Sequence, residues 1–268
     1  MNRQEINLIG GGFQHSLSTS GFEPLYLKWI KGDETSQISI YVDQSIISPT
    51  NPKTKNYGWL CESKTINPDL YNFCFSNIEY LKQNFKYVFT HDVELSKTSD
   101  IFKLVQCSGK SFIPEGKIYN KTKLVSMIAS NKQMCKEHRY RQQIIHKFSN
   151  KCDHYGWGYN QITDKLIGLK DYCFSITMEN ATYSNMFTEK LTDCFMTGTV
   201  PVYYGMANIG EFFNIDGIII LDENFKIEDL TYSLYLSKLE YIVENFNIAK
   251  NMLVSEDYIF KHYLSNEI

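Results

Sequence analysis

Thr188, Glu189 and Lys190 form a short polar run just before a stripe of apolar residues, with Asn180 upstream. At the start of a helix, such groups could bind a nucleotide, because free backbone N–H groups and the helix dipole attract phosphate there. A lysine in the first turn opposes the dipole, and a bound phosphate would remove that conflict. The alternative is that Glu189 and Lys190 are a solvated helix start, since charged residues are common on helix surfaces.

These polar residues follow a predicted strand. Residues 172–178 alternate bulky apolar with small or polar residues and end at Glu179 and Asn180, a pattern typical of a half-buried strand that leads into a loop. Polar groups at the carboxyl end of a strand in an open α/β sheet lie where such sheets bind ligands. The sequence therefore predicts a ligand site after residue 178.

A helix and a second strand complete this unit. An apolar stripe at helical spacing predicts the helix, and it consists of Phe187, Leu191, Cys194 and Phe195. Ser184 or Asn185 could cap its start, and Gly198 is expected to end it. Residues 199–204 predict the next strand, with Pro201 near its beginning. A strand, a helix and a further strand in this order indicate a parallel crossover.

The same segment resembles the donor-binding signature of glycosyltransferase family 10, the α1,3/4-fucosyltransferases. The resemblance is carried by Glu179-Asn180, by Phe187-Thr188-Glu189-Lys190 and by residues 199–205, Thr-Val-Pro-Val-Tyr-Tyr-Gly. Ala181 and Met186 depart from the family pattern, which has serine and usually tyrosine there. The resemblance implies an α/β protein with the GT-B fold, in which two Rossmann-like domains face a central cleft. It also implies GDP-fucose as donor and inversion of the sugar's configuration.

An arginine and a Tyr-Gly pair extend the resemblance upstream. Residues 124–131 predict a strand ending in Ser-Asn, and a helix with an arginine near its start follows. Arg141 matches the family's phosphate-binding arginine by its spacing to Phe148, and Arg139 is the alternative. An arginine can hold a diphosphate through two parallel hydrogen bonds, although either residue could instead lie on the surface. Tyr155 and Gly156 resemble the family's next strand end.

The general base is expected in the first half of the chain. Glu62 and Ser63 follow the predicted strand 58–61, and family members have a catalytic glutamate near such a pair. Glu62 could instead cap the next segment, in which a helix is expected around residues 71–84. The alternatives for the base are His91 and Asp92, which follow the predicted strand 87–90, and His15. The loop that holds Gly11, Gly12 and His15 follows the predicted strand 6–9 and is a further candidate for the cleft.

Composition limits the classes of partner. The 268 residues carry 27 basic and 30 acidic side chains in mixed order, so there is no sign of nucleic-acid binding. No apolar stretch is long enough to span a membrane and no signal peptide is visible, which favours a cytoplasmic protein without an integral membrane segment. The seven cysteines form no CxxC pair, and reduced core residues are expected. Neither they nor the histidines show metal-ligand spacing.

We therefore predict a metal-independent inverting glycosyltransferase that needs no cofactor and transfers fucose from GDP-fucose to a glycan. The predicted domains are an acceptor-side domain at 1–118, a donor-binding domain at 119–250 and a C-terminal helix at 251–268 that could cross back to the first domain. The alternatives are a GT-B transferase with another nucleotide sugar and a non-catalytic sugar-nucleotide or glycan-binding protein. The acceptor lies beyond this prediction, because loops set specificity.

Overall fold

The computed structural model describes residues 3–11, 18–32, 36–106 and 109–267. The chain divides into two compact units, and each is described by itself. The first unit comprises Met1–Ser108 and Leu253–Ile268, and the second comprises Gly109–Met252. The sequence prediction placed these divisions at residues 118 and 250. The C-terminal segment thus returns to the first unit after residue 252.

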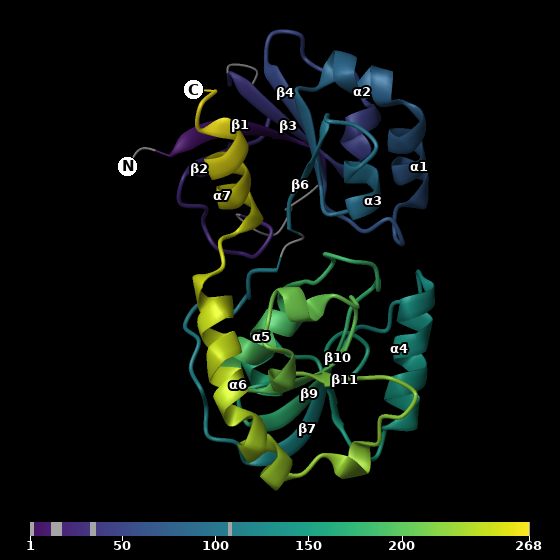
Figure 1. Ribbon diagram of the computed structural model, residues 1–268, viewed down its shortest axis with the longest axis vertical. Helices are drawn as coiled ribbons and strands as arrows, with labels where there is room; N and C mark the ends of the chain where they lie inside the picture. The colour runs from purple at the N-terminus through teal and green to yellow at the C-terminus, as the bar shows by residue number, and fades with distance from the viewer. Residues whose placement is uncertain (1–2, 12–17, 33–35, 107–108, 268) are drawn as a thin grey trace. The chain divides into compact units, whose positions relative to one another are not determined.

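The first unit is built on a six-stranded parallel sheet in the order β2-β1-β3-β4-β5-β6. Its strands are β1 (Gln4–Ile9), β2 (Leu27–Ile30), β3 (Ile38–Val42), β4 (Lys55–Leu60), β5 (Tyr87–Thr90) and β6 (Phe102–Leu104). Its helices are α1 (Pro68–Ser76), α2 (Ile78–Asn84), α3 (Val93–Ser96) and α7 (Ser255–Ile259), with short turns at Asp43–Ile47 and Phe260–Leu264. In Figure 1, α1, α2 and α3 lie on one face of this sheet and α7 lies on the other.

Alternation along β3 shows how one strand supplies both faces of the sheet. Ile38, Ile40 and Val42 belong to the apolar cluster that includes Ile259 of α7. Tyr41, between them, belongs to the cluster formed with α1, α2 and α3. Because side chains alternate across a strand, a strand that is apolar on both faces requires helices on both sides.

Two buried carboxylates attach α7 to the first unit. The carboxylate oxygens of Glu256 accept hydrogen bonds from the backbone N–H of Thr19 at 2.7 Å and from its hydroxyl at 2.9 Å. Asp257 accepts from the N–H groups of Leu25 at 2.8 Å and Tyr26 at 3.2 Å. Burial raises the pKa of Glu256 to about 7, and the hydrogen bonds offset part of that rise. This helix is therefore held by a group that titrates near neutral pH.

This carboxyl group should make stability depend on pH. Its folded-state pKa lies above the unfolded value, so its contribution is fully present below about pH 4.5 and is lost as the pH rises through about 7. Glu256→Gln keeps the shape of the protonated acid and removes that loss. Above pH 7 we expect the variant to exceed the wild type in free energy of unfolding by up to about 3 kcal/mol, and to match it near pH 4.5.

Urea unfolding of both proteins across this pH range measures the difference. Glu79→Gln is the matched control, because the Glu79 side chain is 81% exposed and lies in the same unit. Curves for the wild type and Glu256→Gln that stay parallel across the range would show that Glu256 does not titrate there.

The second unit has a five-stranded parallel sheet in the order β11-β10-β9-β7-β8. The strands are β7 (Lys123–Ile128), β8 (Asp153–Tyr155), β9 (Tyr172–Met178), β10 (Val200–Tyr204) and β11 (Ile219–Ile220). The helices are α4 (Lys136–Lys147), α5 (Glu189–Thr197) and α6 (Tyr232–Asn251). Figure 1 shows α4 on one side of this sheet and α5 and α6 on the other. The chain leaves β7 toward β8 and then returns past β7 to β9, so the strand order reverses between β7 and β9.

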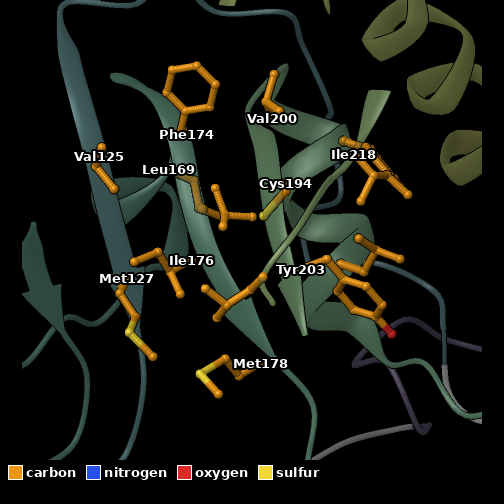
Figure 2. Packing of buried hydrophobic residues seen from close by; sticks show 14 of the residues in the cluster. Val125, Met127, Leu169, Phe174, Ile176, Met178, Cys194, Val200, Tyr203 and Ile218 are labelled. Carbon is orange, nitrogen blue, oxygen red and sulfur yellow. The ribbon is translucent and has the colours of Figure 1, made fainter. Parts of the chain in front are cut away.

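The core of the second unit is continuous across its sheet. Every residue of β9 is buried, as expected for a central strand covered on both faces. Figure 2 shows part of this core, with Met127 of β7 beside Ile176 of β9 and with Cys194 contributed by α5. Met127 and Ile176 are also paired in the register of the two strands. This packing fixes the carboxyl ends of β7 and β9 relative to α5.

The expected α/β class with parallel sheets and two Rossmann-like units is confirmed, but several local predictions were wrong. Residues 71–84 were expected to form one helix, and they form parts of α1 and α2, which are separated by Asn77. The caps proposed for α5 were Ser184 or Asn185, but Thr188 is its N-cap. Asn185 instead has φ of +62°, outside the helical region.

Two compositional predictions also bear on the structure. The six described cysteines are free, and five of them are buried, as expected for reduced core residues. Cys107 lies outside the described residues. Within the described ranges, no helix combines the length and apolar character needed to cross a membrane.

Candidate functional site

A cavity of about 290 Å³ opens at the carboxyl ends of β7 and β9. Its walls come from Ile128–Ser130, from Ser175–Met178, from Gly156 and Trp157, from Arg141 of α4, from Lys165 and Leu169, and from Glu189, Lys190, Asp193 and Cys194 of α5. The strand order reverses between these two strands, and doubly wound α/β sheets bind ligands at such a position. The topology alone therefore makes this cavity the candidate site of the second unit.

The buried side chain of Glu179, which is 1% exposed, holds the first turn of α5. The carboxylate of Glu179 accepts hydrogen bonds from the N–H and the hydroxyl of Thr188, both at 2.8 Å. Thr188 is the N-cap of α5, and its Oγ1 accepts from the N–H of Lys190. The polar residues after β9 thus hold the amino end of α5, the positive end of its dipole, at the wall of the cavity that Glu189 and Lys190 line.

Lys190 folds back toward the start of its own helix. Its Nζ lies 2.8 Å from Oγ1 of Thr188 and 3.4 Å from Oε2 of Glu179. The side chain is 33% exposed, so the ammonium group keeps access to the cavity. The interpretation that Glu189 and Lys190 are a merely solvated helix start does not fit these contacts, because the lysine is held by two buried neighbours.

Glu189 lies between two lysines. Its carboxylate is 3.1 Å from Nζ of Lys165 and 3.9 Å from Nζ of Lys190. Burial alone would raise the pKa of Glu189, but Lys190 and Lys165 outweigh it and lower that pKa to about 2. Glu189 is therefore ionised at every physiological pH, and it can only accept hydrogen bonds from a ligand.

Lys165 and Asp193 also line the cavity, and no sequence pattern predicts either of them as a site residue. Nζ of Lys165 lies 2.7 Å from the buried carboxylate of Asp193, which also accepts from the hydroxyl of Ser111 at 2.6 Å and the N–H of Phe112 at 2.7 Å. Burial raises the pKa of Asp193, and Lys165 offsets part of that rise. Lys165 comes from a turn before β9, and no signal in the sequence pairs it with α5.

Arg141 supplies a cation from the opposite helix. Only 6% of Arg141 is exposed, and its Nη2 donates to both oxygens of Ser130, the backbone carbonyl and the hydroxyl, at 3.2 Å. Its buried Nε has no hydrogen-bond partner among the described residues. An unpaired buried donor is costly, and an anion in this cavity would remove that cost. Arg139, the alternative, is exposed and borders a different surface pocket with Lys136 and Tyr140.

Gly156 lies in the cavity wall, and Tyr155 and Asn180 do not. A Cβ atom on Gly156 would lie 2.2 Å from the carbonyl oxygen of Ala129, so this close approach requires glycine. The hydroxyl of Tyr155 bonds to that of Tyr172 at 2.7 Å, and the buried Oδ1 of Asn180 has no hydrogen-bond partner in the described part of the chain. The structure therefore brings together Arg141, Gly156, Glu189 and Lys190, with Thr188 joined through Lys190.

The candidates of the first unit follow β1, β4 and β5. Gly11 is exposed, and Gly12 and His15 lie outside the described residues. His91 is buried, and burial lowers its pKa to about 4. Asp92 is also buried, caps α3 through the N–H of Leu95 at 2.8 Å and pairs with Lys64 at 2.8 Å.

Glu62 is exposed, unlike those two alternatives. Its backbone is nevertheless held in place: its N–H donates to Oδ1 of Asp43 at 3.1 Å, and its carbonyl accepts from the hydroxyl of Tyr71 at 2.9 Å. Asp43 has φ of +47°, which is uncommon for a residue other than glycine, and burial raises its pKa to about 6. Glu62 is thus an accessible carboxylate on a fixed backbone, which suits a base that meets a second substrate.

Residues 118–247 match the family model described as the C-terminal domain of glycosyltransferase family 10 (fucosyltransferase). No curated protein matches the sequence significantly.

The chain is also similar to solved structures of α1,3-fucosyltransferases. A structure with GDP-fucose has a TM-score of 0.52 at 13% identity, covering 94% of this chain and 92% of the other. One with GDP has a TM-score of 0.53 at 14% identity, covering 95% and 92%. A third has a TM-score of 0.51 at 16% identity, covering 98% and 88%. At these identities the likeness shows the fold, which is GT-B.

Proposed function

Because residues 118–247 of this chain match the C-terminal domain of glycosyltransferase family 10 (fucosyltransferase), we propose that the protein transfers fucose from GDP-fucose to a hydroxyl group of a glycan. The observation that carries the proposal is the unpaired, buried Nε of Arg141 in the cavity where the strand order reverses. The family match and the fold shared with fucosyltransferase structures that contain GDP-fucose and GDP support the choice of donor.

The diphosphate of the donor would lie against Arg141, Lys190 and the amino end of α5. These groups carry two full positive charges and the positive end of a helix dipole, so they can neutralise the charge that grows on the leaving GDP. We therefore propose transfer that needs neither a divalent metal nor a cofactor. Each such contact is typically worth a few kcal/mol at a site from which water is excluded.

Glu189 would bind the ribose. Its carboxylate is ionised and held by Lys165, so it offers fixed acceptors and no donor. Ribose hydroxyls are donors that match such a group, whereas a phosphate oxygen would be repelled by it. Adjacent residues of α5 thus separate the two ends of a nucleotide, with Lys190 toward the phosphates and Glu189 toward the sugar.

The reaction would proceed with inversion at the anomeric carbon. The acceptor hydroxyl oxygen attacks that carbon while the bond from the carbon to the diphosphate oxygen breaks, and the electron pair of that bond leaves with GDP. Glu62 takes the proton of the attacking hydroxyl, so it ends the step as a neutral carboxylic acid. The base acts on the acceptor, and the cations act on the leaving group. Mutation of the base should therefore lower the rate without changing donor affinity, whereas mutation of a cation should change both.

A transfer assay on the full chain tests this function. The protein is incubated with labelled GDP-fucose, a panel of glycans and an excess of chelator, and product is identified by mass. We expect a deoxyhexose to be added to at least one glycan, with release of GDP at the same rate. If the protein instead adds a different sugar from a panel of UDP-sugars, the proposed donor is wrong. Binding of GDP-fucose without turnover on any glycan would favour a non-catalytic binding protein.

A further inference from the structure

Trp157 is an exposed aromatic side chain at the wall of the cavity described above. It is 70% exposed, and it is the only aromatic residue among the described residues that line this cavity. Indole rings usually contribute to stability by burying a large area, so packing does not explain this one. We propose that Trp157 is the surface on which the guanine base of the donor stacks. This inference rests on the proposed function.

Hydrogen bonds hold the backbone on both sides of Trp157, although its ring is exposed. The N–H of Tyr159 donates to the carbonyl of Gly156 at 3.0 Å and closes a turn in which Trp157 is the second residue. Gly158, the third residue, has φ of +91°, the positive value that a type II turn requires at that position. The carbonyl of Trp157 also accepts from the N–H of Asn131 at 3.0 Å. The backbone that carries the ring thus needs no reordering when a ligand binds, which lowers the entropy cost of binding.

The turn is attached directly to the end of β7. A Cβ on Gly156 would meet the carbonyl oxygen of Ala129 at 2.2 Å, and a Cβ on Gly158 would meet the Asn131 side chain at 2.7 Å. Only glycine on both sides lets this turn approach the strand end so closely. The same strand end carries Ser130, which binds Arg141. The proposed base-stacking surface and phosphate-binding arginine therefore share one anchor.

The other polar groups of the cavity already match the diphosphate and the ribose, so the surface at Trp157 remains for the base. Arg141 and Lys190 match the diphosphate, and Glu189 matches the ribose. Lys165 pairs with Asp193 at 2.7 Å and with Glu189 at 3.1 Å. A nucleotide that extends from phosphate through ribose still has a flat aromatic base to place, and an exposed indole face is a suitable partner. Stacking of a base on an aromatic side chain is worth about 1–3 kcal/mol by alanine substitution.

Calorimetric titration of Trp157 variants tests the assignment, with GDP and pyrophosphate as ligands. Trp157→Ala should raise the Kd for GDP about tenfold or more and change that for pyrophosphate by less than about twofold. Trp157→Phe should keep most of the affinity, because it retains an aromatic face. Tyr232→Ala is the matched control, since Tyr232 of α6 is also exposed, at 51%. An unchanged GDP affinity in Trp157→Ala, or equal losses for both ligands, would overturn the proposal.

Fluorescence provides a second readout. The other two tryptophans, Trp29 and Trp59, belong to the first unit. GDP should therefore quench the tryptophan emission of the wild type, and this quenching should disappear in Trp157→Phe. Quenching that persists in Trp157→Phe would overturn the stacking surface while leaving the proposed donor intact. If the wild type binds UDP but not GDP, and quenching by UDP is lost in Trp157→Phe, the stacking surface stands and the proposed donor is wrong.

Discussion

Replacing Glu62 by glutamine should lower the rate of fucosyl transfer by roughly 100-fold or more and leave the affinity for GDP nearly unchanged. Glutamine keeps the size of the side chain but cannot take the proton of the acceptor hydroxyl. The backbone at this position is held by Asp43 and Tyr71, so the substitution should not move the chain. Steady-state rates and calorimetric titration of the same preparation measure both quantities.

Glu79→Gln controls for the general effect of removing a carboxylate, because Glu79 lies in the same unit with its side chain 81% exposed. If Glu62→Gln keeps the full rate of transfer, Glu62 is not the general base and another group must take the proton. His91 is a poor candidate for the general base, because burial lowers its pKa and only 1% of its surface is exposed to an acceptor. His15 would then be the next variant to measure.

Arg141→Ala should weaken the binding of GDP and lower transfer, each by more than tenfold, whereas Arg139→Ala should change neither by more than about twofold. Loss of one charge-assisted contact to a diphosphate typically costs a few kcal/mol, and Arg139 borders a different pocket. Arg141→Lys should also lose most of the affinity, because an ammonium group cannot reproduce the planar fork of the guanidinium. Calorimetry and initial rates on the three variants provide the comparison.

Arg141 also bonds to Ser130, so thermal unfolding must show that each variant is folded. Loss of function in Arg139→Ala with a fully active Arg141→Ala would move the phosphate site to the outer face of α4. That outcome would also remove the reason for placing the donor in the cavity at the carboxyl ends of β7 and β9.

The sequence predicts the second unit well because its signals are local. The alternating run at 172–178 became β9, and the stripe through Leu191 and Phe195 became α5. Gly198 ends that helix in the left-handed region, with φ of +71°, as its position predicted. The stripe Ile144, Ile145 and Phe148 sets the helical phase that makes Arg141 buried and Arg139 exposed.

Features that depend on distant contacts could not be predicted in this way. Lys165 lies beside Glu189 only because a turn before β9 packs against α5, and no motif marks it. Asp43 holds the backbone of Glu62 through a hydrogen bond between residues that are 19 positions apart, which local propensities do not anticipate. Thr188 caps α5 because Glu179 binds its N–H and hydroxyl. The local signal pointed to Ser184 or Asn185 instead, since that tertiary contact is not visible in the sequence.

The most direct test of the central claim is a thermal unfolding series of the full chain in excess chelator with GDP, GDP-fucose and a panel of UDP-sugars. A ligand present at 100 times its Kd should stabilise the folded state by about 2.7 kcal/mol. We expect GDP and GDP-fucose to raise the unfolding temperature without metal, with no shift for the UDP-sugars. A shift with a UDP-sugar and none with GDP or GDP-fucose would contradict the account.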